Sequence, residues 1–203
     1  EEKLFLYPMD YEEFKWALGD NTAIPQLRML FDKKLSLGDA VTRKLMRDFR
    51  IYMVVGGMPQ AVDTYIETNN LMEVDRVKRN IIQLYEDDFY KIDSSGRLSM
   101  LFDAIPAQLN SNASRYQVAS AIGSNTNSDK VLQLISELRE SMTINMAYHA
   151  NDPGVGMSLV MNLNRYKMYI GDTGLFITLA FKDKDFTENI IYQKLMSDKL
   201  DTN

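Results

Sequence analysis

FRIYMVVGGMPQAV, residues 49–62, joins two apolar helical patterns through Gly56, Gly57 and Pro59. Glycine is favoured just past the end of a helix, and proline is favoured in the first turn of the next one. The stretch therefore predicts a sharp corner between two helices. The residues also allow a second interpretation, in which the glycines let the backbone approach a ligand and Pro59 packs on a flat ring.

Helical patterns extend from this corner in both directions. Upstream, Asp10 and Glu13 have the spacing of a capping box, which predicts the start of a helix. Amphipathic patterns with short polar breaks continue to about residue 93, where the polar segment DSSGR begins. We therefore predict a helical bundle over residues 1–93, with a domain boundary at this polar segment.

The pattern changes after the boundary. Three helix-like stretches are followed by two segments rich in alternating and β-branched residues, which the turn-forming NDPGVG joins into a hairpin. This order is typical of a winged helix, predicted over residues 94–180, with a C-terminal helix over 181–203. The predicted fold class is mainly α, a helical bundle followed by a winged-helix domain with a small β-hairpin.

A winged helix suggests nucleic-acid contacts from its third helix, here residues 127–141, and from its hairpin. The basic residues available there are Lys130, Arg139, Arg165 and Lys167. This supply is thin, and the net charge of −5 argues against a strongly basic DNA binder. A protein partner is the alternative for the same surface.

A second group of basic residues precedes the glycine corner. Arg43, Arg47 and Arg50 have spacings that place them on one helical face. Such a stripe could approach phosphates. A solvated face paired with acids such as Asp39 and Asp48 is the alternative interpretation.

Composition excludes several classes of site. The chain has no cysteine and one histidine, His149, so thiolate metal sites and cysteine nucleophiles are excluded. No G-x-x-x-x-G-K-[ST] motif is present, so the chain cannot hydrolyse ATP alone. We predict no catalytic residue and no metal ligand. No apolar run of membrane-spanning length and no secretory signal is seen, so we expect a cytoplasmic protein without a membrane partner.

Five segments, in chain order, resemble one known family. They are LFLYPMDYEEFKWALGD, FRIYMVVGGMPQAV, LYEDDFYKID, AIPAQLN and YKMYIGDTGLF. Together they resemble a widespread prokaryotic family of AAA-type P-loop ATPases whose C-terminal region is a domain of unknown function. The resemblance covers essentially the whole chain, and the ordered set is specific although each piece alone is weak.

This resemblance implies that the chain is the lid and winged-helix part of a longer bacterial ATPase. A P-loop core that binds ATP with magnesium would precede residue 1, and a restriction-endonuclease-like domain would follow residue 203. Related ATPases carry a G-x-P motif in the lid with its proline near the adenine, and Gly57-Met58-Pro59 matches that pattern. The implied nucleotide-binding residues are therefore Gly56, Gly57 and Pro59, with Arg47 and Arg50 beside them.

The resemblance carries no catalytic residue into this chain. Glu188-Asn189 mimics the start of the family's nuclease-type site, but no E-x-K pair follows it. We therefore expect a non-catalytic part of an ATPase, in which the lid senses nucleotide and the winged helix contacts DNA or a partner. The alternative is a protein–protein assembly and regulatory module, with possible self-association, that does not bind nucleic acid.

Overall fold

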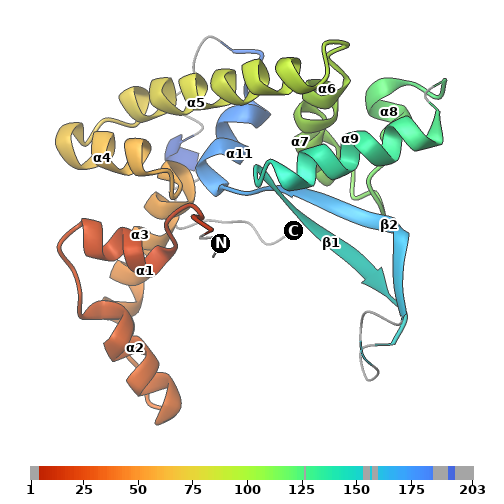
Figure 1. The fold of residues 1–203 in the computed structure, drawn as a ribbon. Helices are drawn as coiled ribbons and strands as arrows, with labels where there is room; N and C mark the ends of the chain where they lie inside the picture. Colours follow the sequence, from red (N-terminus) through yellow and green to blue (C-terminus); the bar gives the residue numbers. More distant parts are fainter. Residues whose placement is uncertain (1–4, 126, 153–155, 157–159, 185–191, 195–203) are drawn as a thin grey trace. The chain divides into compact units, whose positions relative to one another are not determined.

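The computed structural model describes residues 5–125, 127–152, 156, 160–184 and 192–194. In this part of the chain the protein is mainly helical with one two-stranded antiparallel sheet, so the predicted fold class is confirmed (Figure 1). The chain divides into two compact units. Unit 1 comprises Glu1–Asn80 and Asp172–Asn203, and unit 2 comprises Ile81–Gly171.

This division differs from the predicted boundaries after residues 93 and 180. The polar segment at 93–97 is a turn inside unit 2, because the Asp93 carboxylate accepts hydrogen bonds from Ser95 Oγ at 2.7 Å and from the Arg97 N–H at 3.1 Å. The boundary instead lies inside one long helix. Val74 of this helix packs in the core of unit 1, whereas Phe89 contacts Phe102 in unit 2.

The regular elements in the described part of unit 1 are helices. Its elements are α1 (Tyr11–Ala17), α2 (Ala23–Asp32), α3 (Asp39–Val55), α4 (Pro59–Thr68), the first part of α5 (Leu71–Ile92) and α11 (Thr173–Ala180). The predicted capping box is confirmed, since Glu13 N–H donates to Asp10 Oδ1 and Asp10 N–H donates to Glu13 Oε2, both at 2.9 Å. One core cluster of the unit contains Phe14, Val55, Ala61, Val62 and Val74.

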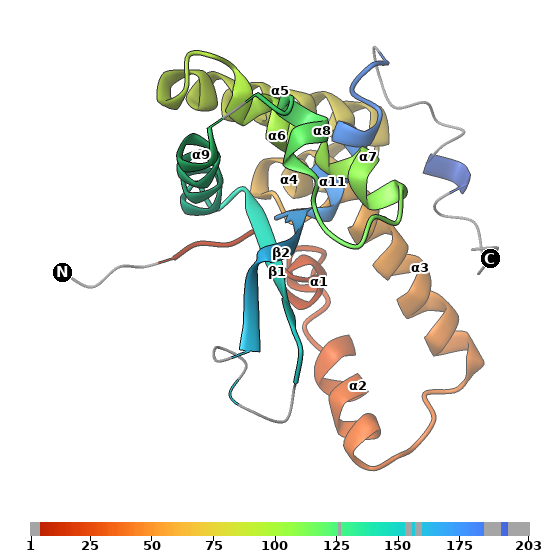
Figure 2. The same cartoon turned by 90° about the vertical axis from the view of Figure 1, so that its right-hand side faces the viewer.

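Unit 2 combines short helices with the hairpin. After the end of α5 come α6 (Arg97–Asp103), α7 (Ile105–Asn110), α8 (Val118–Ile122), α9 (Ser128–Glu140), β1 (Ile144–Ala150) and β2 (Met161–Ile170). The predicted antiparallel hairpin is confirmed, with Ile144 opposite Ile170 and Tyr148 opposite Tyr166. Its far end projects beyond the helices of this unit (Figure 2).

The hairpin has one face packed on the helices. Met168 and Ile170 are buried on that face, whereas the intervening Tyr169 is exposed, as expected for side chains that alternate along a strand. A third extended segment reaches β2, because the Tyr116 N–H donates to the Tyr166 carbonyl at 2.7 Å. The C-terminal helix predicted over 181–203, and Glu188-Asn189 in it, lie largely outside the described residues.

Candidate functional site

The predicted helix corner at residues 55–59 is confirmed. Helix α3 ends at Val55, and Gly56 follows with a φ of 84°, a backbone conformation that residues with a side chain rarely adopt. Pro59 then opens α4, where its missing N–H costs no helical hydrogen bond. We call residues 56–59 the glycine corner.

The glycine corner lies against the N-terminal segment of its own chain. Met9 N–H donates to the Gly57 carbonyl at 2.7 Å, and Tyr52 OH donates to the Met9 carbonyl at 2.9 Å. A Cβ atom at Gly57 would collide with the Met9 carbonyl. Gly57 is therefore required for this close approach, and the space beside it is filled by the protein itself.

Asp172 connects the corner to α11. Its Oδ2 accepts from the Gly57 N–H at 2.5 Å, and its Oδ1 caps α11 by accepting from the Leu175 N–H at 2.8 Å. Gly174 lets the first turn of α11 come this close, since a Cβ there would collide with the Val55 carbonyl. A single buried carboxylate thus links two helix termini that lie far apart in the sequence.

The two glycines have no N–H group left for a phosphate. The Gly56 N–H donates to the Tyr52 carbonyl at 2.7 Å, and the Gly57 N–H is bound by Asp172. A nucleotide role for Gly56 and Gly57 through their N–H groups would require these contacts to break. Their observed role is to make room for Met9 and Asp172.

Buried charges lie beneath the corner. Lys78 of α5 is 0% exposed, and its Nζ donates to the Val54 carbonyl, one of the last carbonyls of α3, at 2.8 Å. Burial lowers the pKa of Lys78 to about 8, against the opposing attraction of Asp75 and Asp172. Burial likewise raises the pKa of Asp172, although the bonds from Gly57 and Leu175 oppose that shift.

Asp75 completes this cluster. Its Oδ1 accepts from Thr178 Oγ1 and from Tyr192 OH, each at 2.9 Å, and its Oδ2 accepts from Arg79 Nε at 2.8 Å. Lys78 also lies 5.5 Å from the centre of the Tyr192 ring. The cluster therefore ties α5 to the C-terminal part of unit 1 through satisfied polar contacts, which is how a protein can bury charges.

Pro59 differs from the glycines because it is exposed. A shallow hollow of about 370 Å³ lies beside it, and Met9, Ala17 and Val62 line this hollow together with the start of α4. The lining is predominantly apolar, with Asp63 as its acidic member. Of the predicted nucleotide-binding residues of the corner, Pro59 is the one that presents a surface to a ligand.

The predicted arginine stripe is not one open surface. Arg47 is exposed, whereas Arg50 is buried. Asp48, expected as a partner for the stripe, instead accepts from Lys15 Nζ at 2.8 Å. Arg47 remains available to an anion, and Arg50 does not face solvent.

The four basic residues predicted to bind nucleic acid lie on different surfaces of unit 2. Lys130 Nζ lies 3.8 Å from Asp93 Oδ1, and Arg139 lines a groove between α9 and the hairpin. Lys167 alternates with the buried Met168 along β2, so its side chain lies on the other face of the hairpin from Met168. Arg165 lies in the irregular stretch of β2 between the paired Asn162 and Tyr166, and it does not line the groove. No single basic patch unites all four.

The sequence did not predict the roles of Lys78 and Asp172. Lys78 occupies an apolar position of α5, four residues after the buried Val74 and four before the buried Ile82, and this position was the available signal. Asp172 precedes α11 as an N-cap residue would, but nothing local indicates that it also binds Gly57. Among the described residues, no group of three or more His, Cys, Asp or Glu side chains is arranged to hold a metal ion.

No described helix combines the length and hydropathy needed to cross a membrane. Comparison with known proteins gives no match to a curated protein and none to a solved structure. One family model does match, over residues 46–185, a span that runs from within α3 to just past α11 and includes the glycine corner, the hairpin and Asp172. Because this match covers more than half of the chain, the protein belongs to the family described as Domain of unknown function (DUF8612).

Proposed function

We propose that unit 1 is the helical lid of a cytoplasmic bacterial P-loop ATPase and that it senses the nucleotide through Pro59. The observation that carries this proposal is the asymmetry of the glycine corner. Its glycines are bound by Met9 and Asp172, whereas its proline is exposed beside an apolar hollow. The hollow has the volume of a small-molecule subsite and suits a flat ring such as adenine.

The contacts of the corner provide a route by which the lid could report on its ligand. Met9 lines the hollow and is hydrogen-bonded to Gly57, and Gly57 is hydrogen-bonded to Asp172. Asp172 directly follows Gly171, the last residue of unit 2, in the chain. A ligand that displaces Met9 or Pro59 would therefore act on the residue where the chain leaves unit 2.

The test is nucleotide binding by the longer protein that includes the proposed ATPase core upstream of residue 1. Pro59→Ala removes two ring methylenes that would contact the adenine base. The affinity for ATP and ADP, measured by calorimetry, should therefore fall roughly tenfold. Pro25→Ala is the matched control, because Pro25 is also an exposed proline in the first turn of a helix, α2. Unchanged affinity in a folded Pro59→Ala protein would refute the lid proposal.

For unit 2 the proposal is a winged helix that contacts DNA or a protein partner. The supporting observation is the order of the elements in unit 2. The extended segment at Tyr116 follows α7 and precedes α8 in the chain, and it is hydrogen-bonded to β2. The order is therefore helix, extended segment, two helices and hairpin. The test is a gel shift on duplex DNA in low salt, compared with the Lys130→Glu, Arg165→Glu, Lys167→Glu triple variant. Salt-sensitive binding that the variant loses would support DNA as the partner.

Absence of any shift in low salt would remove DNA from the proposal. An assembly and regulatory module is then the function to test, by light scattering over a range of protein concentrations. Concentration-dependent oligomers would support that alternative, and a monomer at all concentrations would count against self-assembly.

A further inference from the structure

Unit 2 contains a groove that the nucleotide proposal does not use. Of the four basic residues predicted to bind nucleic acid, it includes Arg139 but none of the three that the DNA test substitutes. It has a volume of about 710 Å³ and lies between α9, the segment 115–119 and the hairpin. Ligand pockets for small organic molecules span about 300–1,000 Å³. The groove is therefore large enough for one such molecule.

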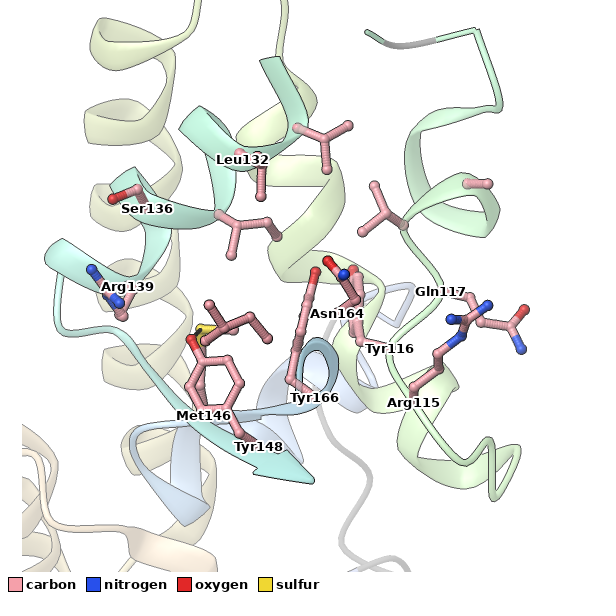
Figure 3. Close-up of a pocket in the computed structure, with 15 residues that line it drawn as sticks. Arg115, Tyr116, Gln117, Leu132, Ser136, Arg139, Met146, Tyr148, Asn164 and Tyr166 are labelled. Carbon is pink, nitrogen blue, oxygen red and sulfur yellow. Dashed lines mark hydrogen bonds between the residues drawn. The ribbon is translucent and has the colours of Figure 1, made fainter. Parts of the chain in front are cut away.

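Large apolar side chains line this groove and remain open to solvent. Leu132 of α9 is 65% exposed and Leu163 of β2 is 63% exposed. The rings of Tyr148 and Tyr166 lie between the two ends of the groove in Figure 3. Exposed apolar side chains that line a concave surface indicate a binding site, because they are not buried in the hydrophobic core.

The polar groups of the groove favour a negative charge. Arg139 and Arg115 lie toward opposite ends of it in Figure 3, and no acidic residue is among the described residues that line it. Glu140 accepts a bond from Ser136 Oγ at 3.1 Å but does not itself line the groove. A ligand with an acidic group would therefore meet cations here.

These cations have no competing partner within the part of the chain that the structure describes. Neither the Arg115 nor the Arg139 guanidinium group makes a hydrogen bond or an ion pair with a described residue, and the same holds for the Tyr166 hydroxyl. In contrast, Lys130 at the start of α9 has Asp93 within 3.8 Å. Binding an anion in the groove would not require an existing ion pair to break.

We propose that this groove binds a small flat organic anion, an aromatic ring system carrying a carboxylate, sulfonate or phosphate group. The ring system lies against the tyrosine and leucine side chains, and the acidic group is bound by Arg139 or Arg115. Charge complementarity favours this ligand class over a neutral one, and the groove volume favours a single small molecule. The site is separate from the glycine corner of unit 1 and does not depend on a nucleotide role there.

The test uses 8-anilinonaphthalene-1-sulfonate, an aromatic sulfonate whose fluorescence rises in an apolar site. Its neutral relative N-phenyl-1-naphthylamine has the same ring body without the charge. We expect saturable binding of one sulfonate per chain, weaker binding of the neutral probe, and weakening by added salt. Arg115→Gln and Arg139→Gln should each lower the sulfonate affinity up to about fivefold, the scale of a solvent-exposed ion pair.

Two further variants localise the probe. Leu132→Trp should fill the groove and reduce binding of both probes, whereas Leu84→Trp is the matched control, an exposed helical leucine of unit 2 that does not line the groove. Arg165→Gln is the matched charge control, because Arg165 does not line the groove either. All substituted residues are exposed, and unchanged thermal unfolding would verify that each variant remains folded.

Three results would overturn the proposal. The first is equal binding of the sulfonate to the wild-type protein and to the Arg115→Gln, Arg139→Gln double variant. The second is undiminished binding to a folded Leu132→Trp protein. The third is displacement of the probe by duplex DNA from the wild-type protein but not from the Arg115→Gln or Arg139→Gln variant. The groove would then be part of a nucleic-acid-binding surface.

Discussion

Lys78 makes the stability of unit 1 depend on pH in a direction that the structure fixes. Its ammonium group is fully buried among Val54, Asp75, Asp172 and the Tyr192 ring. Burial lowers its pKa from 10.5 to about 8 in the folded protein. The unfolded chain therefore holds this proton more tightly than the folded protein does, and the free energy of unfolding rises with pH between about 8 and 10.5.

The size of this effect follows from the two pKa values. A shift of this size corresponds to about 3 kcal/mol in total, at about 1.4 kcal/mol per pKa unit. Between pH 8 and pH 9.5 the linkage relation gives an increase of about 1.6 kcal/mol in the free energy of unfolding. The contribution is lost as the pH falls through the folded-state pKa of about 8. Above pH 9.5 tyrosine ionisation, with an ordinary pKa near 10, adds an opposite trend.

Urea unfolding followed by Trp16 fluorescence measures this effect. Trp16 is the single tryptophan and lies in α1, so its signal reports on unit 1. Between pH 8 and pH 9.5 the free energy of unfolding should rise by about 1.6 kcal/mol more in the wild-type protein than in Lys78→Met. Lys44→Met, which removes an exposed lysine of unit 1, should behave as the wild-type protein does.

The same pH dependence in the wild-type protein and in Lys78→Met would refute the reasoning. It would mean that Lys78 keeps an ordinary pKa, and hence that its ammonium group is hydrated rather than buried against the α3 carbonyl. An opposite slope, with stability falling from pH 8 to pH 9.5 only when Lys78 is present, would mean that attraction to the carboxylates outweighs burial.

Substitutions at Asp172, Gly57 and Tyr116 test other contacts. Asp172→Ala should lower the free energy of unfolding by about 3–5 kcal/mol in urea, because two hydrogen bonds to a buried carboxylate are lost, and Asp172→Asn should cost less because it keeps one acceptor. Gly57→Ala should destabilise the protein more than Gly123→Ala, since only the first added Cβ meets backbone atoms, and equal melting temperatures would argue against the packed corner. Tyr116→Phe should cost about 1 kcal/mol, measured by thermal unfolding, by removing the 2.6 Å bond to the Leu101 carbonyl.

Local sequence signals predicted the elements well where a short-range mechanism sets them. The capping box of Asp10 and Glu13 starts α1, and Gly56 with Pro59 turns α3 into α4, because each signal acts within a few residues. The hairpin followed from alternation around a turn-forming segment. These features depend on backbone conformation, and the residues carry that preference wherever the chain folds.

The division into units did not follow from such signals. The polar residues at 93–97 resemble a linker, but within unit 2 the Asp93 carboxylate accepts hydrogen bonds from Ser95 and from the N–H of Arg97, the first residue of α6. Helix α5 contributes to both cores, and no local pattern shows where one core ends along a continuous amphipathic helix. Which core a residue joins depends on partners that lie far away in the chain.

The sequence by itself determined the helices, the hairpin and the existence of a glycine corner. Only the tertiary structure decided what the corner contacts, by bringing Met9 and Asp172 from opposite ends of the chain to Gly57. It also decided that Lys78 is buried and that Arg115 and Arg139 line one groove with the tyrosines. The physical reason is that helix ends and turns arise from interactions between near neighbours, whereas burial and charge pairing depend on which distant segments pack together.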